Sequence, residues 1–135
     1  MPDGGGLTIL CFDDSEATLT LMAWTLAEYG HEVHTATTAA AALSVVTSCD
    51  LVIIDFHMPG MDGASALEVL KPRAPAESTL FYLYTGDDTA ANSCKDLGFD
   101  GAFTDKGDIS ALPAQVDVAA RRLRLRQFRK RRLAT

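Results

Sequence analysis

The sequence predicts an α/β fold in which a doubly wound, five-stranded parallel sheet has helices on both faces. Short apolar runs alternate with segments of helical period along the chain, a pattern typical of strand–helix–strand units. The most hydrophobic run, residues 50–55, is unbroken, as expected for a buried parallel strand. No internal repeat or second domain is visible, so we expect all the units to belong to one sheet.

The first elements are marked by apolar runs and helix caps. Residues 7–12 form the first predicted strand, and Ser15 is a suitable N-cap for a helix over 16–29. Gly30 suits the C-terminal cap of that helix. Residues 32–36 predict a second, more polar strand, which we place at the edge of the sheet.

The middle of the chain predicts two helices, one before and one after the central strand. Thr37 or Thr38 caps the first of them. Its apolar face consists of Ala39, Ala42, Leu43 and Val46. The strand over 50–55 leads into a glycine-containing loop and then a short helix, which ends near Lys71 because Pro72 cannot continue it.

The last third of the chain predicts two strands and two helices. The strands cover 79–84 and about 100–104, with a helix of about 88–97 between them and a long helix that begins near 108–111. The helix over 88–97 is intrinsically weak, because it contains threonine, asparagine and serine. Five strands joined in this way fit the flavodoxin-like strand order 2-1-3-4-5.

Polar side chains follow four of the predicted strands. Asp13 and Asp14 come after the first strand, Asp55 ends the central strand, Thr85 follows the fourth, and Lys106 follows the last. Ligands of open parallel sheets bind beyond the carboxyl ends of the strands. We therefore expect three carboxylates, a hydroxyl and an ammonium group to meet at one edge of the sheet.

Composition and charge divide the chain into three parts. We expect a flexible N-terminus over 1–6, one globular domain over 7–120 and a basic extension of the last helix over 121–135. The extension contains eight of the 12 lysines and arginines and none of the 18 acidic residues. No apolar run is long enough for a membrane span, and the first residues lack the pattern of a signal peptide. Three cysteines without metal-ligand spacing predict buried thiols in the reducing cytoplasm.

A cluster of three carboxylates needs positive charge close by. Two carboxylates about 4 Å apart repel each other by a few kcal/mol at a protein surface. A hard divalent cation such as Mg²⁺ and the ammonium group of Lys106 would offset this repulsion. One carboxylate can then attack phosphorus and form an acyl phosphate, while the metal, Lys106 and the Thr85 hydroxyl stabilise charge on the phosphoryl oxygens.

These motifs resemble the receiver domains of bacterial two-component response regulators. The resemblance rests on the Asp13-Asp14 pair, Asp55, Thr85 and Lys106, and extends from about residue 7 to residue 120. It also rests on the loop Met58-Pro59-Gly60-Met61-Asp62-Gly63. One departure is Gly107, which follows the lysine where many receivers have proline.

The resemblance implies that Asp55 is the phosphoacceptor, with a sensor histidine kinase or a phosphotransfer protein as donor. It implies Mg²⁺ ligation by Asp14, Asp55 and the backbone carbonyl of His57, with Asp13 acting mainly through metal-bound water. Thr85 and Lys106 would bind the phosphoryl group. The domain would not be an enzyme beyond its own phosphorylation and slow dephosphorylation.

The resemblance also implies a switch and residues that tune it. Phe103 matches the switch aromatic, which turns into the space that the Thr85 hydroxyl leaves when that hydroxyl moves to the phosphoryl group. The face made by the fourth helix, last strand and last helix then changes for a downstream partner. His57 and Asp87 hold the positions that tune how fast water removes the phosphoryl group.

The basic extension allows two interpretations. Leu125 and Phe128 lie among arginines, on the side opposite the predicted core face, which ends near Leu123. The extension is either a solvated helix end or linker, or a docking helix for a protein partner, anionic lipid or nucleic acid.

Three other functions remain alternatives to a phosphorylated stand-alone receiver. An unphosphorylated receiver-like scaffold would dock through its basic tail, but the intact site residues argue against it. A haloacid-dehalogenase-like phosphohydrolase has an Asp-x-Asp signature that Asp13-Asp14-Ser15 lacks. A receiver cut from a longer regulator with an output domain would have this same sequence.

Overall fold

The five strands form one parallel sheet in the predicted order. The computed structural model describes residues 6–134 except 57, 59, 76 and 77, and only the backbone of 130, 131, 133 and 134. The strand order is β2-β1-β3-β4-β5, and every neighbouring pair is parallel. The strands are β1 (Thr8–Phe12), β2 (Glu32–Ala36), β3 (Leu51–Asp55), β4 (Leu80–Tyr84) and β5 (Gly101–Phe103). The predicted fold class and topology are therefore confirmed.

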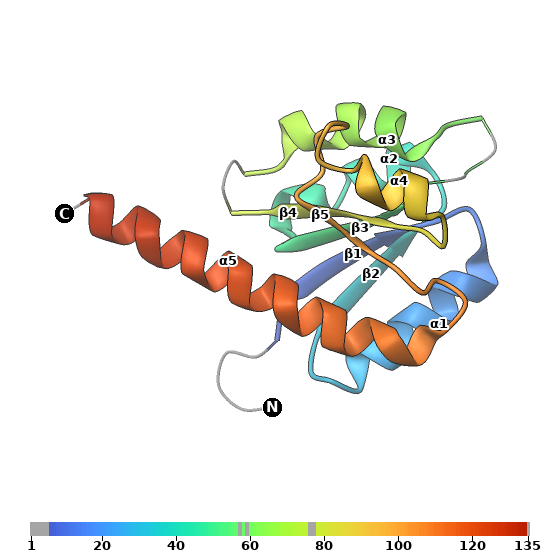
Figure 1. Cartoon of the computed structure of the whole chain (residues 1–135), viewed down its shortest axis with the longest axis horizontal. Helices are drawn as coiled ribbons and strands as arrows, with labels where there is room; N and C mark the ends of the chain where they lie inside the picture. Colours follow the sequence, from blue (N-terminus) through green and yellow to red (C-terminus); the bar gives the residue numbers. More distant parts are fainter. Residues whose placement is uncertain (1–5, 57, 59, 76–77, 135) are drawn as a thin grey trace.

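Helices cover both faces of the sheet (Figure 1). α1 (Glu16–Ala27) and α5 (Leu112–Ala134) lie on one face, whereas α2 (Ala39–Leu43), α3 (Gly63–Leu70) and α4 (Asp88–Asn92) lie on the other. The core accordingly has two parts. One includes Leu26 and Leu123 beneath α1 and α5, and the other includes Leu70 and Phe99 beneath α2 to α4.

Three helices are shorter than predicted. α1 ends at Ala27, two residues before its predicted end. α2 ends at Leu43, and a separate 3₁₀ turn, Val46–Ser48, completes its apolar face. α4 ends at Asn92, five residues before the predicted end. The low helix propensity of this segment explains the early end of α4. A short helix with few buried residues gains too little from packing to offset a low propensity.

α5 is the longest helix and continues past the rest of the fold. A 3₁₀ turn, Ile109–Ala111, precedes it, and Leu123 is its last buried residue among those with a described side chain. In Figure 1 the C-terminal half of α5 extends well beyond the sheet. Within the described part of the chain, no helix combines the length and apolar character needed to span a membrane.

Candidate functional site

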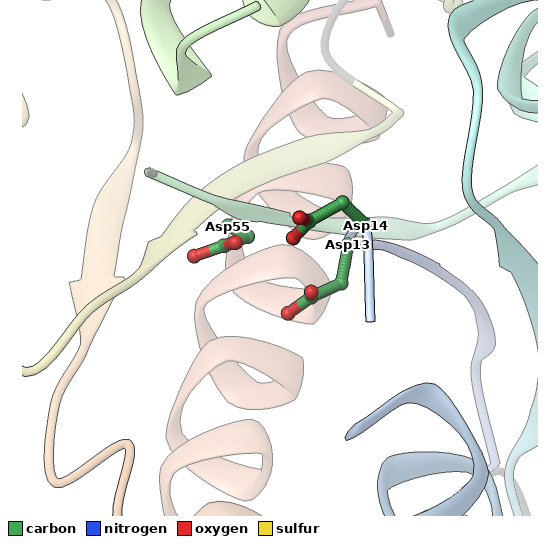
Figure 2. Close-up of side chains that lie close together, drawn as sticks. All are labelled: Asp13, Asp14 and Asp55. Atoms are coloured by element: carbon green, nitrogen blue, oxygen red, sulfur yellow. The ribbon is translucent and has the colours of Figure 1, made fainter. Parts of the chain in front are cut away.

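The sheet brings Asp13, Asp14 and Asp55 together at the carboxyl ends of β1 and β3. One oxygen atom of each carboxylate lies within 4.8 Å of the other two. Figure 2 shows the side chains of Asp13 and Asp14 directed towards Asp55. Asp13 and Asp55 are buried, whereas Asp14 is exposed. Since β1 and β3 are neighbouring parallel strands, this meeting follows from the strand order alone.

Backbone hydrogen bonds fix the position of Asp13. Its own N–H donates to the carbonyl oxygen of Ala36 at 3.1 Å, and the N–H of Ser15 donates to Asp13 Oδ1 at 2.9 Å. Ser15 is the N-cap of α1, as predicted, because its hydroxyl accepts a hydrogen bond from the N–H of Thr18. Burial, with a further contribution from the Asp55 charge, raises the pKa of Asp13, while Ser15 and Lys106 oppose this rise.

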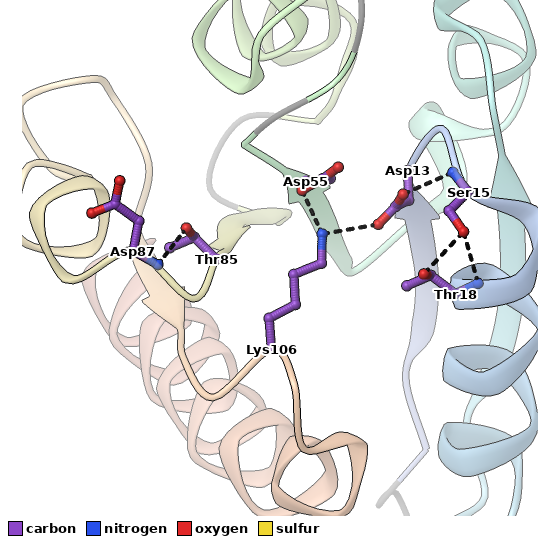
Figure 3. Close-up of polar contacts among 7 residues, drawn as sticks. All are labelled: Asp13, Ser15, Thr18, Asp55, Thr85, Asp87 and Lys106. Carbon is purple, nitrogen blue, oxygen red and sulfur yellow. Dashed lines mark hydrogen bonds and ion pairs between the residues drawn. The ribbon is translucent and has the colours of Figure 1, made fainter.

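Lys106 lies between two of the carboxylates. Its Nζ is 2.5 Å from Asp55 Oδ1 and 3.1 Å from Asp13 Oδ2 (Figure 3). The same ammonium group lies 5.6 Å from the centre of the Tyr84 ring. Asp105, directly before the lysine, has a φ of 57°, which is unusual for a residue other than glycine. This left-handed turn after β5 directs the lysine back over the sheet edge.

The loop between β3 and α3 holds the end of β3 in place. The Gly63 N–H donates to the Phe56 carbonyl oxygen at 3.0 Å, and a Cβ at Gly63 would lie 3.1 Å from Phe56 Cα. Asp62 caps α3 by accepting the N–H of Ser65 at 2.8 Å, a hydrogen bond that lowers the pKa of Asp62. The Asp-Gly pair of the motif thus has a local structural role. His57, predicted as a carbonyl ligand and tuning residue, lies outside the described residues.

Thr85 follows β4 at the same edge, but its hydroxyl is turned towards α4. Thr85 is buried, and its Oγ1 accepts a hydrogen bond from the Asp87 N–H at 2.9 Å (Figure 3). Asp87 is the N-cap of α4, and its carboxylate accepts the N–H groups of Thr89 and Ala90. Asp87 is therefore tied to both the predicted hydroxyl and the predicted signalling helix.

Phe103 is buried beneath α5 rather than in an open position. It is 2 % exposed, and its ring stacks on that of Tyr82 with centres 4.4 Å apart. The Arg122 side chain covers Tyr82 from α5. Neither Tyr82 nor Arg122 stands out in the sequence, because Tyr82 lies within an apolar strand and Arg122 is one of many arginines in the basic extension.

The predicted docking residues of the tail are separate from this site. Leu125 and Phe128 are each 50 % exposed on the part of α5 beyond Leu123. Arg132 lies over the Phe128 ring, with its guanidinium carbon 5.8 Å from the ring centre.

The carboxylate cluster suits a hard divalent cation. Three carboxylates within reach of one another provide oxygen ligands only, the type that Mg²⁺ prefers. Burial is the main cause of the raised pKa of Asp13, so a bound cation would offset the cost of keeping this buried carboxylate charged. The donor set therefore fits Mg²⁺, and Asp13, Asp14 and Asp55 are the residues that would hold it.

Known proteins with similar sequences belong to two-component signalling systems. The profile of the response regulator receiver domain matches residues 9–117. A putative two-component response regulator of Arabidopsis thaliana, ARR19, is 32 % identical over 102 residues, which cover 73 % of this chain and 24 % of the relative. The sensor protein GacS of Pseudomonas syringae pv. syringae is 40 % identical over 65 residues, covering 47 % of this chain and 7 % of the relative. The chain thus spans a quarter or less of the length of these curated relatives.

Solved structures of receivers have the same fold. The receiver domain of the Francisella response regulator 1452 matches with a TM-score of 0.70 at 23 % identity, covering 86 % of this chain and 98 % of that one. A response regulator receiver domain protein from Clostridium thermocellum matches with a TM-score of 0.71 at 25 % identity, covering 87 % and 97 %. With the profile match over most of its length, the chain belongs to the response regulator receiver domain family.

Proposed function

We propose that this receiver accepts a phosphoryl group on Asp55 from the phosphohistidine of a sensor histidine kinase or a phosphotransfer protein. The contact of Lys106 Nζ with both Asp55 and Asp13, beside the third carboxylate, is the observation that carries this proposal. An ammonium group, which is suited to bind phosphate, thus lies beside a buried carboxylate that could act as the nucleophile.

In the proposed transfer, a carboxylate oxygen of Asp55 attacks phosphorus while the phosphorus–nitrogen bond of the donor breaks. The donor imidazole keeps the bonding electron pair and then gains a proton. Bound Mg²⁺ would supply charge stabilisation at the phosphoryl oxygens. Lys106 exchanges its ion pair with Asp55 for contact with the new phosphoryl group, and Asp13 holds the lysine in place.

The proposed signal passes from the phosphoryl group to the face formed by α4, β5 and α5. The Thr85 hydroxyl leaves the Asp87 N–H, at present 2.9 Å away, for a phosphoryl oxygen. Because the Asp87 N–H lies at the start of α4, this exchange of hydrogen-bond partners alters the N-terminus of the helix. The surface around Phe103 then changes for a downstream protein.

The alternatives fit the site less well. A scaffold that is never phosphorylated has no need for Lys106 to lie between two carboxylates. The similarity to sensor proteins and to a longer regulator supports kinase or phosphotransfer partners, and is equally compatible with a receiver joined to other domains. We place the reaction in the cytoplasm, where the buried thiols of Cys11, Cys49 and Cys94 stay reduced.

A direct test is intact-mass analysis after incubation with acetyl phosphate and Mg²⁺. We expect the wild-type chain to gain the mass of one phosphoryl group, and Asp55→Asn to gain none. Asp96→Asn, which changes an exposed aspartate distant in sequence from the site, is the matched control and should behave as wild type. A wild-type chain that stays unmodified, or an Asp55→Asn variant that is modified equally, would contradict the proposal.

We also propose that the extension of α5 docks on an acidic protein surface. Its exposed side chains combine arginines, including Arg121, Arg124 and Arg129, with Leu125 and Phe128. Arginines interrupt the apolar stripe, which leaves no wide apolar face for insertion into a lipid bilayer. Two apolar anchors among arginines suit a protein surface with pockets and an acidic rim better than a nucleic-acid backbone.

A further inference from the structure

The Phe103 ring is buried although the Thr85 hydroxyl has not turned to Asp55. In the proposed switch these two movements are coupled. Here the hydroxyl is bonded to the Asp87 N–H, while Phe103 is 2 % exposed. Some other contact must therefore hold the ring in its buried position in this state of the chain.

Tyr82 supplies that contact. Its ring stacks on Phe103 with an interplanar angle of 22° and is itself 5 % exposed. The tyrosine reaches Phe103 by lying across Gly101, its partner in the sheet register. A Cβ at Gly101 would lie 2.7 Å from Tyr82 Cε2, so the stack depends on glycine at that position.

Arg122, on α5, holds Tyr82 in this position. Its Nη1 donates to the Tyr82 hydroxyl at 2.8 Å and to the Asp100 carbonyl oxygen at 2.9 Å. Its guanidinium carbon is 5.9 Å from the centre of the Tyr82 ring, within the range of a cation–π contact. Arg126 adds an ion pair with the Asp100 carboxylate at 3.1 Å, so two turns of α5 are tied to the beginning of β5.

The Phe103 ring has an alternative position beside its buried one. A groove of about 410 Å³ lies between α4 and α5, and both Tyr82 and Phe103 belong to its lining. The other lining residues include Ala91, Ala102, Gln115 and Val118, most of them small or flexible. Leaving the buried position for this groove would cost Phe103 its stacking contact with Tyr82.

We propose that Tyr82 and Arg122 are positioning residues that hold Phe103 buried before phosphorylation. This inference rests on the proposed function of Asp55. If the phosphoryl group favours the buried ring, a chain that already holds the ring buried binds that group more tightly. The apparent affinity falls in proportion to the fraction of molecules in the competent state. The arginines of α5 thus help to set how readily the receiver switches.

The test measures the affinity of the Mg²⁺-loaded chain for beryllofluoride, a mimic of the phosphoryl group, by calorimetric titration. We expect Tyr82→Leu to weaken this affinity by about two- to tenfold, the range that an aromatic pair contributes. Gly101→Ala, which displaces the ring with one methyl group, should act in the same direction. Arg122→Met should weaken it by about twofold, and Tyr82→Phe, which keeps the stacked ring, should lie closer to wild type than Tyr82→Leu.

Two controls separate positioning from general destabilisation. The affinity for Mg²⁺ alone should stay unchanged in all these variants, and Arg124→Met, which changes an exposed arginine on the same helix, should match wild type. In a Phe103→Leu background, Tyr82→Leu should cause no further loss, because its effect acts through that ring.

The outcomes distinguish this inference from the function on which it rests. A wild-type chain that binds beryllofluoride, with Tyr82→Leu and Gly101→Ala binding equally well, would overturn the positioning role alone. So would a loss from Tyr82→Leu that persists unchanged in the Phe103→Leu background. A wild-type chain that neither binds the mimic nor accepts a phosphoryl group would reject the proposed function, and this inference with it.

Discussion

Asp13 pays an electrostatic cost for its buried position at the site. It is 3 % exposed and close to Asp55, so its charged form loses hydration and meets a like charge. Its pKa is raised above the ordinary value of 3.8. The folded protein therefore binds a proton at Asp13 more tightly than the unfolded chain does. This group adds stability as the pH falls through its raised pKa, and destabilises the metal-free fold at neutral pH.

We predict that Asp13→Asn raises the melting temperature of the metal-free chain at neutral pH. A gain of about 3–5 °C corresponds to roughly 1 kcal/mol in a domain of this size. Millimolar Mg²⁺ should stabilise the wild-type chain and stabilise Asp13→Asn much less, because asparagine removes one negative charge from the cluster. Calorimetry with and without a chelator measures both effects. Equal Mg²⁺ stabilisation of the two proteins would show that Asp13 takes no part in the metal site.

At the scale of elements, α4 depends on Asp87 more than on its own sequence. The helix has five residues, and Ala90 is its only buried member. The Asp87 carboxylate accepts two of its first N–H groups. Asp87 was predicted to tune the lifetime of the phosphoryl group, and it also caps the start of α4. Different substitutions are needed to separate these two roles.

We predict that Asp87→Ala speeds hydrogen exchange of the α4 amides by about fivefold, since loss of an N-cap costs about 1 kcal/mol. Asp87→Asn keeps a capping oxygen but removes the charge, so exchange should stay near the wild-type rate. A change in phosphoryl lifetime in both variants would assign the tuning to charge. A change in Asp87→Ala alone would assign it to the position of the helix.

Four of the five strands were predictable because each is a short apolar run with a polar residue at its end, whereas β2 is more polar. The central strand, for example, was predicted over 50–55 and is Leu51–Asp55. Local sequence also determines the caps, so Ser15 and Thr38 were found. The length of α4 was overestimated, because its alanines and Cys94 fit a helical stripe while helix propensity stopped it at Asn92.

The packing around Phe103 was beyond sequence reasoning. The contact between Tyr82 and Arg122 joins residues 40 positions apart, and nothing in either local segment specifies it. The left-handed Asp105 turn was equally hidden, because positive φ is uncommon for residues other than glycine. The site residues at the strand ends could be predicted, because the sheet topology alone brings them to one edge. The contacts that orient their side chains could not, because they depend on tertiary packing.

The molecule as a whole has opposite charges at its two ends. The acidic residues all lie before position 120, and eight basic residues follow it. α5 carries this basic segment away from the sheet (Figure 1). Attraction between the tail of one copy and the acidic body of another is weakly screened at low salt, where the Debye length reaches about 30 Å at 0.01 M.

We predict salt-sensitive self-association of the whole chain. Sedimentation velocity at low ionic strength should show a sedimentation coefficient that rises with protein concentration, and moderate salt should abolish the rise. A chain that ends at Leu123 should remain monomeric under both conditions. Replacing Leu125 and Phe128 with serine tests whether the apolar anchors add to the charge. Association that survives truncation would exclude the tail as its cause.

The unbroken course of α5 also gives its outer half a fixed rotational phase. The Arg122 and Arg126 contacts with β5 set the angle at which the helix leaves the fold. An α-helix turns by about 100° per residue. One alanine inserted after Arg126 would swing Phe128 about a quarter of a turn away from Leu125, whereas seven inserted residues would nearly restore their alignment. The helical phase, and not only the presence of basic and apolar side chains, thus decides in which direction the extension of α5 presents Leu125 and Phe128.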